Sequence, residues 1–285
     1  MREKYLKWVL LAPALIIIAS LVFYPLVYAL RTSLFLFRYG KPVQFVGLKN
    51  YAELFANKLF YNSLKNTGIY VSVAVTVEFV LGMFLALLMN RELGRFRKIV
   101  RAALTIPMFV SPIVVGIIWR MMYNPQYGLF NWFLGTRGFA PTGNQHLAIF
   151  FVILADVWMW TPFMYIIFLA ALQSVPPEIL EASLIDGANP RQQLFRVIMP
   201  SIAYAMVIAF TLRFMDATKA LDIIYTLTFG GPGAATETAG FMIFRNAFND
   251  IKIGTATAYS WLFTVLIGVI ISFFMGWFNR RFEIV

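Results

Sequence analysis

Charged side chains stand inside long apolar stretches of this 285-residue sequence. Glu78, Asp156, Arg213 and Asp216 each lie in a run long enough to cross a membrane, where a charge is costly unless it faces a cavity or a partner. With about 1.5 Å of helical rise per residue, all four lie between the midplane and the outer third of an apolar core about 30 Å thick. We therefore expect them to form one polar layer.

Two kinds of chemistry fit such a layer. Carboxylates and an arginine beside the rings of Trp158 and Trp160 suit a sugar, because hydroxyls form directional hydrogen bonds and sugar C–H faces stack on aromatic rings. The alternative is a structural network, for example a pair between Arg213 and Asp216 at positions i and i+3 of one helix. The sequence leaves both interpretations open.

Several chemistries are excluded by the sequence itself. No G-x-x-x-x-G-K-[ST] loop occurs, since Gly40-Lys41 is followed by Pro42, so we expect no ATP binding by this chain. HExxH, G-x-S-x-G and clustered metal ligands are missing, and without cysteine there are no disulfides or thiolate sites. His146, the only histidine, is interpreted as a loop residue. We expect no enzyme activity, no cofactor and no metal, with energy supplied by a partner.

The elements that position these residues are membrane spans. Hydrophobic residues make up 60% of the chain, charged residues only 13%, and the mean hydropathy is +0.74, which indicates a polytopic membrane protein. We predict an all-α membrane protein with six transmembrane helices. The spans are residues 8–30, 66–89, 102–122, 147–172, 200–221 and 255–278. The first is too long for a signal peptide and is expected to stay uncleaved.

Other segments are assigned by composition. Pro107 and Pro112 predict a kink in the third span. Residues 31–65 are polar and aromatic, with a short amphipathic helix. Residues 123–145 are rich in turn residues and are expected to form an external loop, whereas residues 225–254 are expected to be re-entrant or external.

Charge distribution predicts the orientation. Six spans put both termini on one side, and the numbers of Lys and Arg on the two sides are too similar to choose that side. The density of these residues does choose the side, because one short segment holds five of them. The positive-inside rule, by which cytoplasmic loops are rich in Lys and Arg, works best on short loops. The five residues are Arg91, Arg95, Arg97, Lys98 and Arg101. We expect both termini in the cytoplasm and no nucleic-acid binding despite the net charge of +11.

Residues 173–198 separate the fourth and fifth spans and are predicted to form a helix-turn-helix elbow. Pro177 suits the first position of a helix. Gly187 suits the left-handed residue that ends it, and Pro190 begins a second helix. The small residues Ala182, Ser183 and Gly187 would let the surface of another protein approach closely.

The elbow resembles the EAA loop of ABC importer permeases, whose pattern is Glu-Ala-Ala, Gly, then Ile-x-Leu-Pro. The matching residues are Glu181, Ala182, Ser183, Gly187, Val197, Met199 and Pro200. Ser183, Val197 and Met199 depart conservatively from that pattern. The resemblance implies that the elbow docks on a nucleotide-binding subunit, with Glu181, Ala182, Ser183, Gly187, Val197 and Pro200 as the coupling residues.

A second set of motifs resembles carbohydrate permeases of the maltose/trehalose and glycerol-phosphate branch. It comprises residues 212–217 (LRFMDA), 221–228 (LDIIYTLT), which include Asp222, and 230–233 (GGPG). This resemblance divides the chain into a first span with its external loop (1–65) and a five-span permease core (66–285). It implies a prokaryotic plasma-membrane importer with a second permease, a pair of ATP-binding subunits and an external sugar-binding protein.

The expected function is transport of an α-glucoside such as maltose or trehalose by alternating access. The substrate pathway is expected to include Glu78, Asp156, Trp160, Arg213, Asp216 and Asp222. The alternative is a secondary transporter or channel without an ATPase, which inverted-repeat symmetry would support; the sequence shows no such symmetry. A membrane enzyme lacks its catalytic residues here.

Overall fold

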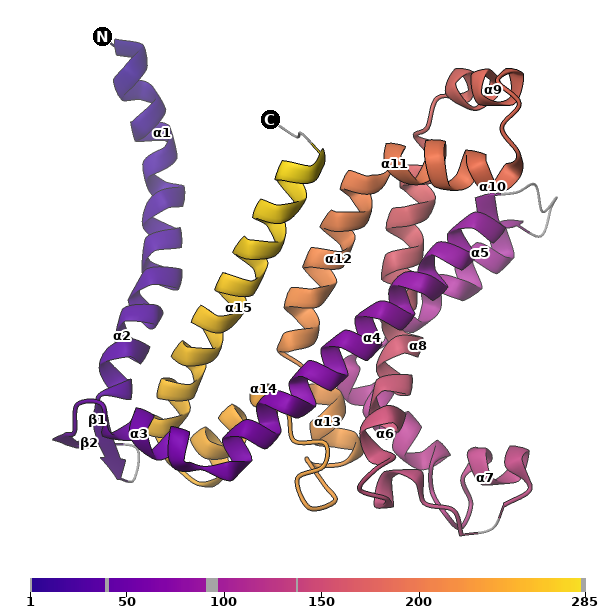
Figure 1. Cartoon of the computed structure of the whole chain (residues 1–285). Helices are drawn as coiled ribbons and strands as arrows, with labels where there is room; N and C mark the ends of the chain where they lie inside the picture. Colours follow the sequence, from indigo (N-terminus) through magenta and orange to yellow (C-terminus); the bar gives the residue numbers. More distant parts are fainter. Residues whose placement is uncertain (1, 39–40, 91–96, 137, 283–285) are drawn as a thin grey trace. The chain divides into compact units, whose positions relative to one another are not determined.

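The structure is a computed structural model that describes residues 2–38, 41–90, 97–136 and 138–282 (Figure 1). The described residues are mostly helical, as the composition predicts. They form two compact units, one of residues 1–60 with 242–285 and one of residues 61–241. The predicted division of the chain into residues 1–65 and a permease core of residues 66–285 stays a prediction.

The first unit contains two apolar helical segments, α1–α2 and α15, and a small hairpin that follows α2 in the chain. Its elements are α1 (Arg2–Ile18), a π-helical turn (Ala19–Phe23), α2 (Tyr24–Ser33), β1 (Phe35–Arg38), β2 (Lys41–Phe45), α3 (Lys49–Ala56), a second π-helical turn (Arg245–Asn249) and α15 (Ile253–Phe282). The antiparallel hairpin β1–β2 lies within the loop after the first span, where only a short helix, α3, was predicted. Within this unit, α1 begins and α15 ends at the same end, opposite the hairpin (Figure 1).

One close approach fixes the hairpin against α15. The Asn50 side chain donates hydrogen bonds to the Ser33 and Phe35 carbonyl oxygens at 2.7 and 3.0 Å. A Cβ at Gly254 would lie 2.3 Å from that Phe35 oxygen and 2.8 Å from the Asn50 amide nitrogen. Only glycine permits this contact without displacing the backbone.

The second unit is a helical bundle around α8. Its elements are α4 (Lys58–Asn90), α5 (Arg97–Thr105), a 3₁₀ turn (Ile106–Phe109), α6 (Pro112–Met122), α7 (Leu129–Leu134), a 3₁₀ turn (Pro141–Gly143), α8 (Ala148–Gln173), α9 (Pro177–Ile185), α10 (Pro190–Gln192), a π-helical turn (Gln193–Ile198), α11 (Met199–Ser201), α12 (Ala203–Thr218), α13 (Asp222–Leu227) and α14 (Ala239–Phe244). In α8, 67% of the span window is buried, so both sides of this helix carry apolar core residues.

Four continuous helices are long and apolar enough to cross a membrane, and two bent pairs raise the number to six if each pair is one span. The continuous ones are Lys7–Ser33, Lys58–Asn90, Ala148–Gln173 and Ile253–Arg280. The predicted six-span, all-α membrane fold is confirmed in that sense.

The third and fifth spans are broken rather than merely kinked. The third bends by 98° between Phe109 and Pro112, because Val110 and Ser111 are extended before the proline. The fifth bends by 66° at Ile202, between α11 and α12. The predicted fifth span, residues 200–221, therefore corresponds to a shorter helix that ends at Thr218.

One further boundary differs from prediction. Helix α4 begins at Lys58, eight residues before the predicted start of the second span. In the basic segment that follows it, Arg91 and Arg95 lie outside the described residues. Arg101 is described, and its Nη2 donates to the Met89 carbonyl oxygen at 3.1 Å, which joins the start of α5 to the end of α4.

Candidate functional site

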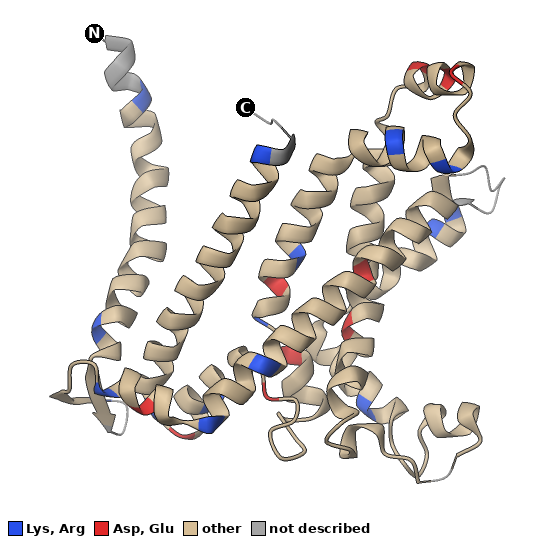
Figure 2. Ribbon diagram, viewed as in Figure 1, with Lys and Arg blue, Asp and Glu red and all other residues tan. Residues whose placement is uncertain are grey.

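Charges are sparse along the long helices of the second unit, and a few acidic residues lie in the middle of them (Figure 2). These charges meet at Arg213 on α12, whose side chain is 1% exposed. Its Nε donates to Glu78 Oε2 at 2.6 Å and its Nη2 to Glu78 Oε1 at 2.9 Å. The same Nη2 donates to Asp156 Oδ2 on α8. One guanidinium thus joins α4, α8 and α12.

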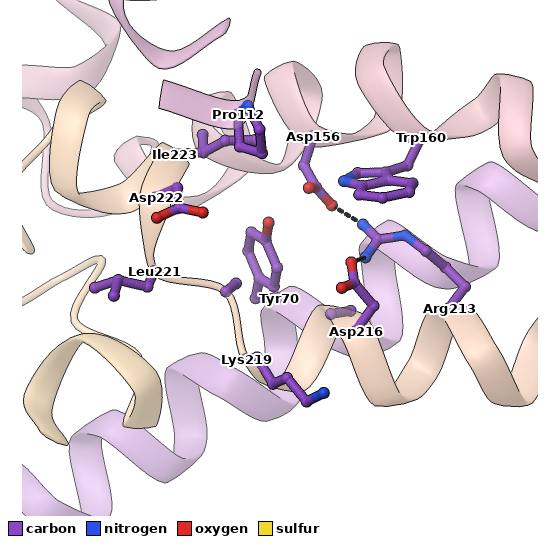
Figure 3. A pocket seen from close by; sticks show the side chains of 12 residues that line it. Tyr70, Pro112, Asp156, Trp160, Arg213, Asp216, Lys219, Leu221, Asp222 and Ile223 are labelled. Carbon is purple, nitrogen blue, oxygen red and sulfur yellow. Dashed lines mark hydrogen bonds and ion pairs between the residues drawn. The ribbon is translucent and has the colours of Figure 1, made fainter. Parts of the chain in front are cut away.

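The fourth charge lies at the edge of this network. Arg213 Nη1 donates to Asp216 Oδ2 at 3.1 Å, and the Asp216 side chain is 51% exposed. The Trp160 ring lies beside the guanidinium, with its centroid 5.0 Å from Arg213 Cζ, which is a cation–π distance (Figure 3). The structure therefore brings together all four predicted charges of the polar layer.

A pocket of about 150 Å³ opens beside this network. Its lining residues are Tyr70, Pro112, Asp156, Trp160, Arg213, Asp216, Ala217, Lys219, Ala220, Leu221, Asp222 and Ile223 (Figure 3). Five of the six predicted pathway residues line it; the sixth, Glu78, is fully buried behind Arg213. Ligand pockets commonly measure about 300–1,000 Å³, so this one has room only for a single ring or side group.

Tyr70 is one of the pocket residues that the sequence did not predict. It is 1% exposed and precedes Glu78 by two steps of four residues along α4. That spacing puts both side chains towards one face of the helix, so the signal was present. Trp158, expected near the polar layer, instead packs edge-on against Trp119 with ring centroids 6.1 Å apart and is absent from the lining.

The two interpretations of the charges apply to different residues. Glu78 and Asp156 are buried counter-ions of Arg213, as a structural network requires. Asp216 uses only Oδ2 in the contacts of the described chain, and it is half exposed at the pocket. No group of His, Cys, Asp and Glu that could hold a metal ion occurs among the described residues.

The elbow has the predicted helix-turn-helix geometry. Helix α9 begins at Pro177, and Gly187 has φ +78°, the left-handed value expected after a helix end. The second helix begins at Pro190 behind a capping box: Asn189 Oδ1 accepts from the Gln192 amide, and the Asn189 amide donates to Gln192 Oε1, both at 2.9 Å. The Asn-x-x-Gln spacing is the sequence signal for this cap.

Ser183 points into the elbow, which corrects its predicted place on the outer surface. It is 7% exposed, and Gln193 Nε2 donates to its Oγ at 2.9 Å and to the Leu180 carbonyl at 3.1 Å. This bond pair clamps α9 to the following π-helical turn. Glu181 and Ala182 stay exposed, beside an apolar tip at Ile185 that is 87% exposed. Of the other coupling residues, Val197 is half-buried and Pro200 exposed.

Helix α9 lies at the opposite end of the second unit from α7 (Figure 1). The elbow is therefore remote from the loop of residues 123–145, as six spans with an intervening elbow require. The pocket lies between these ends, on the same helix, α12, that follows the elbow in the chain.

Known proteins resemble this chain over nearly its whole length. The trehalose/maltose transport system permease protein MalF of Thermococcus litoralis is 36% identical over 98% of this chain and 96% of its own. The sn-glycerol-3-phosphate transport system permease protein UgpA of Pectobacterium atrosepticum is 30% identical over 93% and 91%. Both belong to the branch that the sequence motifs resemble.

The fold also matches a solved structure. A chain of a bacterial alginate ABC transporter, crystallised with an alginate pentasaccharide-bound periplasmic protein, superposes with a TM-score of 0.84 at 21% identity, over 98% of this chain and 96% of its own. The model of the binding-protein-dependent transport system inner membrane component family matches residues 78–284. The chain belongs to that family.

Proposed function

We propose that the chain is a permease subunit of an ATP-driven importer that carries a neutral α-glucoside di- or oligosaccharide of the maltose and trehalose kind. The observation that carries this proposal is the 36% identity with a trehalose/maltose permease along 98% of the chain. The pocket supports it, since Asp216, Asp222 and the Trp160 ring offer the acceptors and the aromatic surface that a sugar ring uses.

The importer would contain this chain, a second permease, two ATP-binding subunits and an external sugar-binding protein. The chain carries no nucleotide-binding loop, so ATP hydrolysis belongs to the ATP-binding subunits. The pocket is too small for a disaccharide, and the second permease would complete the site. No metal or cofactor is needed by this scheme.

In this scheme the elbow is the ATPase contact, through its exposed Glu181, Ala182 and apolar tip. Its second helix continues through Met199–Ser201 and, after the 66° bend at Ile202, into α12, which carries Arg213 and Asp216. A movement of the elbow is thereby passed along the chain to the pocket. We propose that this movement alternates access to the pocket from the two sides of the membrane.

The proposed orientation places the elbow and both termini in the cytoplasm of a prokaryotic cell. It follows the density of Lys and Arg in the inner segments. The loop of residues 123–145 then faces the binding protein, and residues 66–285 form the permease core.

Uptake by vesicles tests this function. Vesicles containing the whole importer are given radiolabelled maltose, trehalose, lactose and glycerol 3-phosphate, together with the purified binding protein. Uptake of an α-glucoside is the expected result. Vesicles that take up none of the sugars, or only glycerol 3-phosphate, would contradict the proposal.

A further inference from the structure

The buried guanidinium of Arg213, beside the pocket, is already hydrogen-bonded to carboxylates of the protein. A guanidinium has five N–H donors, and Arg213 uses them in four contacts: two with Glu78, one with Asp156 and one with Asp216. Its side chain is 1% exposed. A phosphate or carboxylate entering the pocket therefore finds no free guanidinium fork for the bidentate binding that such groups favour.

The charges around the pocket are net negative. The lining and the ion network together hold four carboxylates and two cations: Glu78, Asp156, Asp216, Asp222, Arg213 and Lys219. Lys219 is exposed, and in Figure 3 its side chain extends away from Tyr70 and Asp222. An anionic ligand in the pocket is therefore repelled.

Hydrogen-bond acceptors, in contrast, remain available. In the described part of the chain Asp216 engages only Oδ2, and its side chain is half exposed. Asp222 is exposed at the start of α13, and no hydrogen bond of its carboxylate occurs among the described residues. Carboxylate oxygens accept from hydroxyl donors, so the pocket suits a group that donates several hydrogen bonds and carries no charge.

We propose that this pocket selects an uncharged polyhydroxy ring and rejects phosphorylated or carboxylated sugars, with Asp216 and Asp222 as the determinants. The volume of about 150 Å³ limits the selected group to one ring of the cargo. This inference rests on the proposed function, because the selectivity applies to a transported sugar. It assigns selectivity to the membrane subunit itself, in addition to any selectivity of an external binding protein.

The test measures binding to the purified membrane complex without the external binding protein, which would impose its own preference. Radiolabelled trehalose is bound at equilibrium and displaced by unlabelled trehalose or by trehalose 6-phosphate, which differ only in the charged group. We expect trehalose to compete at least about tenfold better, a difference of about 1.4 kcal/mol. Equal or stronger competition by the phosphate ester would overturn the inference, as would the absence of any trehalose binding.

Two variants identify the determinants. Asp222→Asn removes a pocket charge that does not pair with Arg213, so we expect this variant to fold normally. It therefore keeps the test valid if Asp216→Asn, which loses a contact with Arg213, fails to fold. In both variants, the tenfold preference for trehalose over trehalose 6-phosphate is expected to fall several-fold. Glu53→Gln, which removes an exposed carboxylate paired with Lys49 at 3.8 Å, should leave it unchanged. An unchanged preference in both pocket variants would show that these carboxylates do not cause the rejection.

Failure of this inference and failure of the function give different results. If vesicles with the whole importer take up trehalose while trehalose 6-phosphate competes equally in the binding assay, only the selectivity is overturned. If the vesicles take up no α-glucoside, the proposed function fails as well.

Discussion

Arg213 and Glu78 lie 135 residues apart in the chain and form a two-pronged ion pair, with contacts of 2.6 and 2.9 Å, inside the second unit. Both side chains are 1% exposed or less. A buried pair of this kind contributes little net stability by itself, but each partner makes the other's burial tolerable. The pair therefore fixes α4 against α12 and holds Asp216 at the edge of the pocket.

Removing one partner of this pair should destabilise the protein strongly. Glu78→Gln removes the carboxylate that accepts two buried hydrogen bonds from Arg213, and breaking a buried pair costs about 3–5 kcal/mol. We expect a marked fall in the unfolding temperature of the purified complex and in its yield. Glu53→Gln is the matched control, since an exposed pair contributes about 0–1 kcal/mol. Equal stability of the two variants would show that the buried pair between Glu78 and Arg213 does not stabilise the fold.

Asp216→Asn should instead affect transport more than folding, because Asp216 is half exposed and its loss leaves Arg213 with two carboxylates. Hydrogen bonds to charged groups contribute about 1.5–3 kcal/mol, which corresponds to a loss of about ten- to a hundredfold. We expect that loss in sugar uptake, with normal assembly and basal ATP hydrolysis. Normal uptake would exclude a sugar contact at Asp216.

Adding Arg213→Gln to Asp216→Asn should lower the yield of folded protein. If Asp216 were only the counter-ion of Arg213, removing both charges would be compensating. Arg213 also neutralises Glu78 and Asp156, so the double variant leaves two buried carboxylates unpaired. Its yield is expected to fall well below that of Asp216→Asn alone, and a yield equal to or above that of Asp216→Asn would contradict the three-carboxylate network.

The elbow can be tested at Gly187, whose φ of +78° disfavours most side chains although nothing lies within 4 Å of a Cβ built there. Gly187→Leu is expected to lower co-purification of the ATP-binding subunit, because the turn between the two elbow helices must rearrange. Asparagine tolerates the left-handed conformation, so Gly187→Asn should retain assembly if geometry is the cause. Loss in both variants would indicate a steric contact instead, and normal assembly in both would contradict docking at the elbow.

The orientation can be tested directly, because the chain has no cysteine. Ser183 is too buried for a labelling site, at 7% exposure, whereas Ile185 is 87% exposed. Ile185→Cys should react with a membrane-impermeant maleimide only from the cytoplasmic side. His146→Cys, in an exposed turn before α8, should react only from outside. The reverse pattern would overturn both the orientation and the proposed role of the elbow.

The sequence predicts the spans and the polar layer because both depend on local signals. Apolar length marks helices such as Ala148–Gln173, and a charge within such a run requires a partner. Which carboxylate meets Arg213 depends on packing between helices distant in the chain, so the buried roles of Glu78 and Asp156 could not be separated from that of Asp216. The 98° break at Pro112 exceeds the predicted kink, because two extended residues precede the proline.

In the elbow, residue types predict the turn and its prolines but not which side chains face inward. Ser183 reads as a small surface residue, and only the fold shows that Gln193 clamps it. The hairpin after the first span was missed, because its strands of four and five residues carry weak local signals.

In the proposed scheme, this chain imports sugar only when partner subunits hydrolyse ATP. The most direct measurement is uptake of labelled trehalose or maltose into vesicles that contain the whole importer, with ATP enclosed or omitted, and with or without an imposed proton or sodium gradient. We predict uptake that requires enclosed ATP and is unaffected by the gradients. Uptake driven by a gradient in the absence of ATP would contradict the proposed ATP-driven import and identify a secondary transporter.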